Sequence, residues 1–272
     1  MSDNIEEIKA TSASARSFWD SQAERFALRP VPSWKSDRLL RRISKYSMLS
    51  KDSTVLDIGC GAGRYSVALS SKCKKLTATD ISSEMLACAE AASLKNKRTN
   101  IDFKLTDWHN LSISDIGWHN KFDLVFANMT AAIRSPEDFD KMLSAGRNWG
   151  ICTAPLYRQD FVLDFLRNDV LNKPQKFDMK NTFEYAFKKL RELDLLPGIE
   201  YRRENRIDEF DTEYAFGFYI SRLSMDEILS ESEKREIKKA IDSLAKFGKI
   251  ENAVSTLTFT LLWSKNRENI LP

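Results

Sequence analysis

The sequence predicts an α/β fold: a doubly wound, mostly parallel seven-stranded sheet with helices on both faces. Two observations predict it. From Thr54 onward, short apolar segments typical of buried strands alternate with segments of helical period. The first of these strands runs directly into a glycine-rich turn, Gly59–Gly63, and then into a helix. We expect an N-terminal helical segment before the sheet and a helical insertion before its last strand.

The segment before the first strand is expected to be helical. Within 17–26, Trp19 and Phe26 fall on one face of a helix. Pro30 breaks the chain, and a second helix is expected over 35–46. The basic outer face of this second helix is typical of a solvated surface.

Five strands and two helices are expected in the central part of the chain. The strands are short runs of apolar and β-branched residues, and Ser82 or Ser83 provides an N-cap for the second helix. The strands fall at 54–58, 75–80, 100–105, 122–128 and 149–153, and the helices at 64–71 and 82–94. Strands joined through helices in this way lie parallel in one sheet.

The pattern is less regular after Pro155. Helices are expected at 159–171, 179–195, 214–223 and 225–246, and strands at 199–207 and 254–263. The chain contains no internal repeat and no Gly/Ser-rich linker that would separate independent domains.

The composition is that of a folded protein without a strong bias of charge. Hydrophobic residues make up 42% of the chain, and 42 Lys+Arg against 39 Asp+Glu leave a net charge of +3. This small excess does not favour binding to a phosphate backbone, so nucleic acid is not an expected partner. The four cysteines form no C-x-x-C pair and only two histidines accompany them, so we expect no metal site.

The apolar segments indicate a cytoplasmic protein. Residues 1–10 carry acidic side chains where a secretory signal has basic ones. The best apolar stretch, 253–263, is interrupted by hydroxyl residues and is shorter than the roughly 20 residues that span a bilayer. We therefore expect no contact with membranes, and thiols that stay reduced.

The clearest motif is the turn after the first strand, Asp57-Ile58-Gly59-Cys60-Gly61-Ala62-Gly63. Glycines there let the backbone turn sharply and lie against a ligand with no Cβ in the way. The fingerprint of NAD-binding folds has its third glycine one residue later, where this chain has Arg64. Asp57 is a poor neighbour for a pyrophosphate and a good acceptor for an ammonium group. A nicotinamide-dependent oxidoreductase is therefore disfavoured.

This D-x-G-x-G-x-G arrangement resembles the first motif of the class I S-adenosylmethionine-dependent methyltransferases, and the likeness extends over about 53–153. The resemblance implies S-adenosyl-L-methionine as the cofactor and S-adenosyl-L-homocysteine as the product. It also implies that Asp80 accepts the ribose hydroxyls and that Ile81 packs on adenine. Asp107 matches the residue that binds the exocyclic amine of adenine.

Two further positions follow from the same resemblance. The backbone N–H of Trp108 would address the adenine ring nitrogen, and the backbone carbonyl of Asn128 would help to hold the amino group of the ligand. The full set of expected cofactor-binding residues is Asp57, Gly59, Cys60, Gly61, Gly63, Asp80, Ile81, Asp107, Trp108 and Asn128.

The resemblance also divides the chain. We expect a helical lid at 1–50, a cofactor-binding core at 51–160, an elaboration lining the substrate side at 161–250, and the last core strand with the tail at 251–272, all within one structural domain. In similar methyltransferases an N-terminal helix folds over the cofactor, so Trp19 and Phe26 are candidates for the substrate side. Packing of these two side chains against the core is the alternative. Tyr157 and Arg158, after the fifth strand, are the other substrate-side candidates.

No residue is assigned as catalytic. A sulfonium methyl group is already activated, so positioning supplies much of the acceleration, and a general base is needed only for a hydroxyl or a protonated amine. His109 and His119 could serve as that base, but an ordinary hydrogen-bonding role is favoured for each.

The acceptor is expected to be a small molecule. The fourth strand ends in Ala127-Asn128-Met129-Thr130, without the Pro-Pro-aromatic motif of enzymes that methylate the amino groups of adenine and cytosine. A non-catalytic protein that binds S-adenosylmethionine or S-adenosylhomocysteine for regulation, and an RNA or protein methyltransferase, stay open as alternatives. The oligomeric state is not predicted.

Aromatic residues concentrate in the later part of the chain. They could line an acceptor pocket, but packing of the additional helices is favoured. The residues concerned are Phe177, Phe183, Tyr185, Phe187, Phe210, Tyr214, Phe216, Phe218 and Tyr219.

Overall fold

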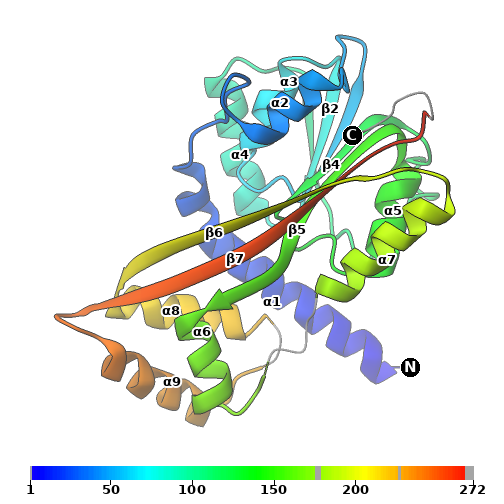
Figure 1. Ribbon diagram of the computed structural model, residues 1–272. Helices are drawn as coiled ribbons and strands as arrows, with labels where there is room; N and C mark the ends of the chain where they lie inside the picture. Colours follow the sequence, from blue (N-terminus) through cyan, green and yellow to red (C-terminus); the bar gives the residue numbers. More distant parts are fainter. Residues whose placement is uncertain (1, 175–178, 226–227, 267–272) are drawn as a thin grey trace. The chain divides into compact units, whose positions relative to one another are not determined.

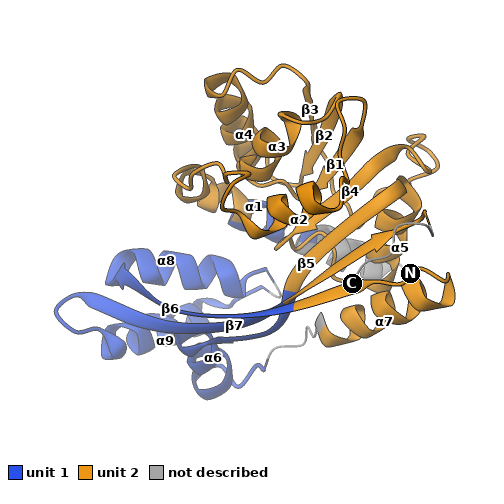
Figure 2. Ribbon diagram, turned by 45° about the horizontal axis from the view of Figure 1, so that its top comes forward, with its two compact units in different colours: residues 1–18, 155–178, 201–258 blue, residues 19–154, 179–200, 259–272 orange. Residues whose placement is uncertain are grey.

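The structure, a computed structural model, describes residues 2–174, 179–225 and 228–266. They form two compact units, which Figure 2 distinguishes by colour. Unit 1 contains the described residues of 1–18, 155–178 and 201–258, and unit 2 contains those of 19–154, 179–200 and 259–272. The division of the chain at residues 50, 160 and 250 that the sequence indicates stays a prediction.

One sheet of seven strands has the order β3-β2-β1-β4-β5-β7-β6, as Figure 1 shows. The strands are β1 (Thr54–Ile58), β2 (Lys75–Asp80), β3 (Ile101–Leu105), β4 (Phe122–Asn128), β5 (Gly146–Asp160), β6 (Gly198–Asp211) and β7 (Lys249–Ser264). Parallel pairings join β1 to β2 and β4, β2 to β3, and β4 to β5. The strand order changes direction between β1 and β4, where open α/β sheets bind their ligands.

β7 runs antiparallel to the strand on either side of it. In both pairings the residue number rises along one strand while that of its partner falls. Asn148–Lys265 and Thr153–Thr260 join β5 to the β7 segment. Arg202–Thr258 and Asn205–Ser255 join β6 to β7. The predicted seven-stranded α/β sheet is confirmed, but the sheet is mixed, because both pairings of β7 are antiparallel.

Helices of unit 2 lie on both faces of its part of the sheet. They are α2 (Arg38–Lys45), α3 (Arg64–Ser70), α4 (Ser83–Lys95), α5 (Pro136–Ala145), α7 (Met179–Glu192) and residues 19–27 of α1 (Ser2–Ala27). Leu262 packs in a hydrophobic core with residues of α2 and α3. Its neighbour Trp263 points to the other face, where its ring lies 5.4 Å from that of Phe139 in α5.

Unit 1 has a hydrophobic core of its own. Its helical elements are α6 (Phe161–Phe165), the π-helical turn η1 (Leu166–Val170), α8 (Thr212–Leu223) and α9 (Glu231–Leu244). The buried Asn252 of β7 joins this core to α6, because it accepts a hydrogen bond from the Val162 amide and donates one to Asp160. Of the aromatic residues that the sequence concentrates here, Tyr219 is fully buried and Phe210 is 7% exposed. Phe216 and Phe218 are partly buried against the same core, and Tyr214 is exposed. Phe177 lies outside the described residues.

The early elements fall close to their predicted positions, and the late strands are longer than predicted. β1, β2 and β4 have the predicted bounds. β5 continues to Asp160, beyond the predicted end at residue 153, and β6 continues to Asp211. Residues 201–207 of β6, which lie inside the strand predicted at 199–207, are all exposed.

Two late helices differ from their predicted extents. The helix expected at 159–171 is the short α6 followed by the π-helical η1. The helix expected at 225–246 is α9, and it begins at Glu231 because Ser230 and Glu233 form a capping box there.

Candidate active site

The turn after β1 brings three glycines into the left-handed backbone region. The φ angles of Gly59, Gly61 and Gly63 are 64°, 54° and 77°. A Cβ on Gly59 would lie 1.8 Å from Thr130 Oγ1, and one on Gly63 would lie 2.7 Å from the Cβ of Ala89. Glycine is therefore required at Gly59 and Gly63 by close approach as well as by backbone conformation.

The glycine loop is hydrogen-bonded to the carboxylate of Asp80 at the end of β2. The Gly61 amide donates to Asp80 Oδ2 at 2.8 Å, and the Ser82 amide donates to Asp80 Oδ1 at 3.0 Å. Burial raises the pKa of Asp80, and these backbone hydrogen bonds oppose the rise. Each carboxylate oxygen keeps lone-pair capacity for a further donor, such as a ligand hydroxyl.

Asp57 is the second-to-last residue of β1, just before the glycine loop, and it is almost fully buried. Its Oδ2 accepts a hydrogen bond of 2.5 Å from Ser66 Oγ, on α3. Burial raises the pKa of Asp57 to about 7; the Ser66 hydrogen bond opposes this rise, and the charge of Asp80 adds to it. Two buried carboxyl groups that repel each other favour a ligand that carries positive charge and hydroxyl donors.

The C-terminal part of α1, residues 19–27, packs on the glycine loop and on the start of α4. Asp20 Oδ1 accepts a hydrogen bond of 2.6 Å from Ser82 Oγ, the N-cap of α4. The rings of Trp19 and Phe26 meet edge to face at 5.9 Å, in a small cluster with Met85. Phe26 Cδ1 lies 4.0 Å from the position of a Cβ on Gly61. Trp19 and Phe26 are therefore brought to the glycine loop.

Asp107 and Trp108 follow β3, whose end is tied to β2 by a hydrogen bond from the Thr106 amide to the Asp80 carbonyl. The Asp107 carboxylate accepts from the His109 amide at 3.1 Å and from Asn110 Nδ2 at 2.8 Å. The Trp108 side chain is buried and donates to the carbonyl of Asp138. These contacts fix the loop at the end of β3 next to Asp80.

His109 is held from both sides. Its Nδ1 lies 2.8 Å from the buried carboxylate of Asp138, and its Nε2 accepts from Arg134 Nε at 2.8 Å. A ring nitrogen that already accepts a hydrogen bond is not free to remove a proton from a substrate, so the structural role predicted for His109 is favoured.

His119 lies away from the glycine loop. It precedes β4 and contacts Ser144 and Asn120, at the amino end of a strand whose carboxyl end carries Asn128. Neither histidine is placed as a general base.

Asn128 ends β4 next to β1, since the preceding Ala127 pairs with Ile58. After Asn128 the chain turns through Met129, with a φ of 54°, and Thr130 then covers Gly59. This turn brings the end of β4 onto the glycine loop.

Tyr157 and Arg158 are exposed residues of β5 in unit 1. The guanidinium of Arg158 donates to Asp160 Oδ2 at 3.0 Å. The predicted cofactor residues, with Trp19 and Phe26, belong to unit 2, whereas Tyr157 and Arg158 belong to unit 1.

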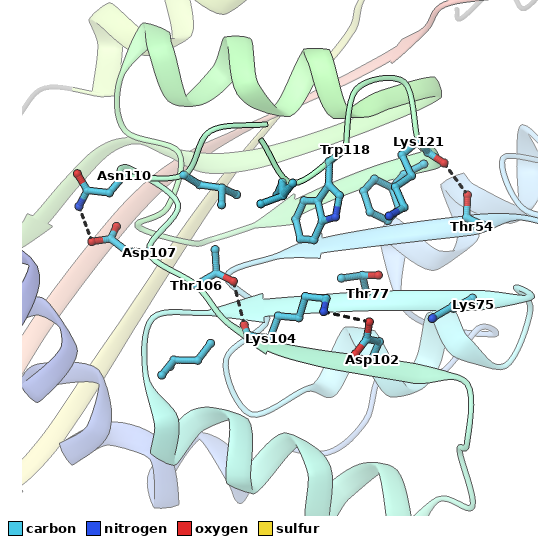
Figure 3. Close-up of a pocket in the computed structure, with 14 residues that line it drawn as sticks. Thr54, Lys75, Thr77, Asp102, Lys104, Thr106, Asp107, Asn110, Trp118 and Lys121 are labelled. Carbon is cyan, nitrogen blue, oxygen red and sulfur yellow. Dashed lines mark hydrogen bonds and ion pairs between the residues drawn. The ribbon is translucent and has the colours of Figure 1, made fainter. Parts of the chain in front are cut away.

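A pocket of about 870 Å³ lies over β2 and β3 in unit 2. Figure 3 shows its polar lining, which includes Lys75, Thr77 and an ion pair of 3.4 Å between Lys104 and Asp102. Of the predicted site residues only Asp107 lines it, and Asn110 lies beside Asp107 there. The chain between β3 and β4 forms turns and no helix, so this part of the sheet face is left open.

Among the described residues, no group of His, Cys, Asp or Glu side chains is arranged to hold a metal ion. None of the described helices combines the length and the apolar character that a membrane crossing requires. Cys60, Cys73, Cys88 and Cys152 form no disulfide.

The parallel strands, the glycine loop and the acidic groups at the strand ends define a nucleotide-binding type of α/β fold. Residues 55–149 match the model of a family described as a methyltransferase domain. Residues 55–149 therefore resemble a methyltransferase domain, and the resemblance to the class I S-adenosylmethionine-dependent methyltransferases is confirmed. No curated protein matches the sequence.

Solved structures with similar folds have low sequence identity to this chain. Phosphoethanolamine N-methyltransferase 2 of Haemonchus contortus, in complex with phosphomonomethylethanolamine and S-adenosylhomocysteine, has 15% identity and a TM-score of 0.50, covering 92% of this chain and 60% of that one. The YcgJ protein of Bacillus subtilis has 14% identity and a TM-score of 0.49, covering 83% of this chain and 96% of that one. At such identity the likeness to the first structure shows the fold and leaves the acceptor open.

Proposed function

We propose that the protein transfers a methyl group from S-adenosylmethionine to a small-molecule acceptor. The observation that carries this proposal is the arrangement of Asp57, Asp80 and the glycine loop at one edge of the sheet, with Gly61 hydrogen-bonded to Asp80 at 2.8 Å. S-adenosylmethionine carries an ammonium group, a sulfonium and two ribose hydroxyls. These groups match two buried carboxyls better than a pyrophosphate does.

Each cofactor contact is assigned to a residue of unit 2. Asp57 accepts from the ammonium group, through its carboxylate, and Asp80 accepts from the ribose hydroxyls. Ile81 packs on the adenine ring, whose exocyclic amine donates to Asp107. The remaining contacts come from backbone groups, those of Gly59, Cys60, Gly61, Gly63, Trp108 and Asn128.

The chemical contribution of the chain is to hold two molecules in line and to exclude water. The bound cofactor would supply a methyl group that is already activated, so an acceptor with a neutral lone pair would need no prior proton transfer. Trp19 and Phe26 pack against the glycine loop and limit the access of water there. Tyr157 and Arg158 stay candidates for the acceptor side.

Two observations support a small acceptor over RNA. Arg202 and Arg206 form no continuous basic surface, because they pair with Glu204 and Asp208 at 2.8 and 2.9 Å. The net charge of the whole chain is only +3. We also propose a cytoplasmic location, which the four free cysteines support.

The test is a transfer assay with S-adenosylmethionine labelled in its methyl group. The full chain is incubated in parallel with a cell metabolite fraction, with total RNA and with a dialysed protein extract, and Asp80→Ala serves as the control. We expect labelled product only in the metabolite fraction, with release of S-adenosylhomocysteine. Label in RNA or protein would support an RNA or protein methyltransferase instead. Binding of S-adenosylmethionine without labelled product in any fraction would favour a regulatory role.

A further inference from the structure

β6 is the last strand of the sheet, and β7 is its single neighbour among the described strands. Figures 1 and 2 show β6 running beside β7, with residues 201–211 of β6 in unit 1. Residues 201–207 are exposed on both faces of the strand, with Ile207 71% and Tyr201 55% exposed. A long sheet edge of this kind presents backbone N–H and C=O groups to another strand.

The contacts between β6 and β7 show which backbone groups point outward. Thr258 Oγ1 donates to the carbonyl of Arg202, and just beyond the strands the Thr212 amide donates to the carbonyl of Gly248. In an antiparallel ladder, alternate residues direct their backbone groups to the same side. The even-numbered residues of β6 therefore face β7, and the odd-numbered residues from 201 to 209 face the open edge.

The charges on β6 are self-complementary. Arg202, Glu204, Arg206 and Asp208 follow one another on one face of the strand with alternating sign. An antiparallel pairing with a second copy, centred on Asn205, puts Arg202 opposite Asp208 of the partner subunit. It also puts Glu204 opposite Arg206 of the partner subunit, and two-fold symmetry repeats both pairs.

Other registers match less well. A pairing centred on Arg203 keeps Arg202 opposite Glu204 of the partner subunit, but it opposes Arg203 to itself. Pairings centred on Glu204 or Arg206 bring like charges together. They also require backbone groups of even-numbered residues, which already bind β7, to bind the partner subunit. Charges that prevent an edge strand from pairing with a second copy of itself have to repel that copy, whereas the charges on β6 attract it in this register.

We propose that β6 pairs antiparallel with β6 of a second copy of this chain, centred on Asn205. About ten main-chain hydrogen bonds join the two strands in this register. Arg202, Glu204 and Arg206 are 46–54% exposed in their side chains, so they can reach a partner although each also has an ion pair within its own strand. Ile207 then packs on the aliphatic part of Arg203 of the partner subunit.

The test is a charge-swap experiment by sedimentation velocity on the full chain, over a range of micromolar concentrations at low salt. Glu204→Arg and Arg206→Glu each place two pairs of like charges in the interface. Either variant alone is expected to raise the dissociation constant of the dimer about tenfold to a hundredfold. An equimolar mixture restores opposite charges at both pairs and is expected to recover the dimer.

Lys238→Glu on α9 is the matched control, because it makes the same change of charge as Arg206→Glu at an exposed ion pair outside β6. It is expected to leave the dimer intact. Circular dichroism verifies that each variant is folded. The proposal is overturned if the unmodified chain is a monomer throughout, if folded single variants dimerise as well as the unmodified chain, or if the mixture does not recover the dimer.

Discussion

The Gly61 amide donates a hydrogen bond of 2.8 Å to Asp80, so the turn after β1 is attached to the carboxylate that ends β2. The Thr106 amide donates to the carbonyl of the same residue and attaches the end of β3. Asp80 therefore connects three consecutive strand ends. A carboxylate held in this way is already oriented before a ligand arrives, which lowers the entropy lost on binding.

Replacing Gly59 with alanine should destabilise the protein strongly. The new Cβ would meet Thr130 Oγ1 at 1.8 Å, and the φ of 64° is unfavourable for any residue with a Cβ. The backbone effect alone amounts to about 1–2 kcal/mol, and displacement of Thr130 adds to it. Thermal or urea unfolding measures the loss of stability.

Gly117→Ala is the matched control for this prediction. Gly117 has a similar φ of 63°, but no atom lies within 4 Å of its Cβ position. It should show the backbone effect without the steric one. Equal losses for the two variants would show that the contact between Gly59 and Thr130 is not tight.

The stability should depend on pH through Asp57. Burial raises the pKa of Asp57 from 3.8 to about 7, so the folded protein holds a proton that the unfolded chain releases between about pH 4 and 7. The contribution of Asp57 to the free energy of unfolding is therefore lost as the pH rises through this window. Relative to Asp57→Asn, the unmodified protein should become less stable from pH 5 to pH 8, by on the order of a few kcal/mol.

Urea unfolding of both proteins at several pH values measures this difference. S-adenosylmethionine at saturation should reduce it, because its ammonium group stabilises the charged carboxylate. A difference between the two proteins that is constant over the whole pH range would contradict the assignment.

Phe26→Ala should weaken the binding of S-adenosylmethionine about tenfold, because it removes the ring that packs beside Gly61. Isothermal calorimetry well below the unfolding temperature measures the affinity. Phe247→Ala is the matched control, since Phe247 is fully exposed. An affinity unchanged by Phe26→Ala would mean that this ring only seals α1 to the core.

His109→Gln should lower stability by about 1–2 kcal/mol and leave the pH profile of methyl transfer unchanged. Burial opposes ionisation of Asp138, but the hydrogen bonds from His109, from Ser135 and from the Arg134 amide outweigh it and hold the pKa of Asp138 low. His119→Gln, at an exposed position, is the control and should change stability by less than about 0.5 kcal/mol. Loss of the acidic limb of the pH profile in His109→Gln alone would show instead that this residue acts as a general base.

The sequence predicts much of the fold because the decisive residues are consecutive. Apolar runs bounded by turn residues place β1, β2 and β4, and parallel strands end at one edge of a sheet, so Asp57 and Asp80 are expected to be neighbours. The extension of β5 and the full length of β6 escape prediction because tertiary pairing, rather than apolar alternation, holds these segments in the sheet.

The contacts around the glycine loop could not be predicted in the same way. Ser66, Thr130 and Asp20 come from α3, the turn after β4 and α1, and they reach the loop only through the packing of these elements. A serine on a helix or a threonine in a turn carries no sequence pattern that distinguishes these partners from other surface residues. The Ser82 N-cap was predictable, but its contact with Asp20 was not.

Calorimetric titration with S-adenosylmethionine, S-adenosylhomocysteine and NAD tests the central claim most directly. The unmodified protein should bind one equivalent of either adenosyl ligand and no NAD. Asp80→Ala should weaken that binding at least about tenfold, and Asp102→Ala in the neighbouring pocket should leave it unchanged. Binding of NAD without S-adenosylmethionine, or an affinity for S-adenosylmethionine that Asp80→Ala does not alter, would contradict the account.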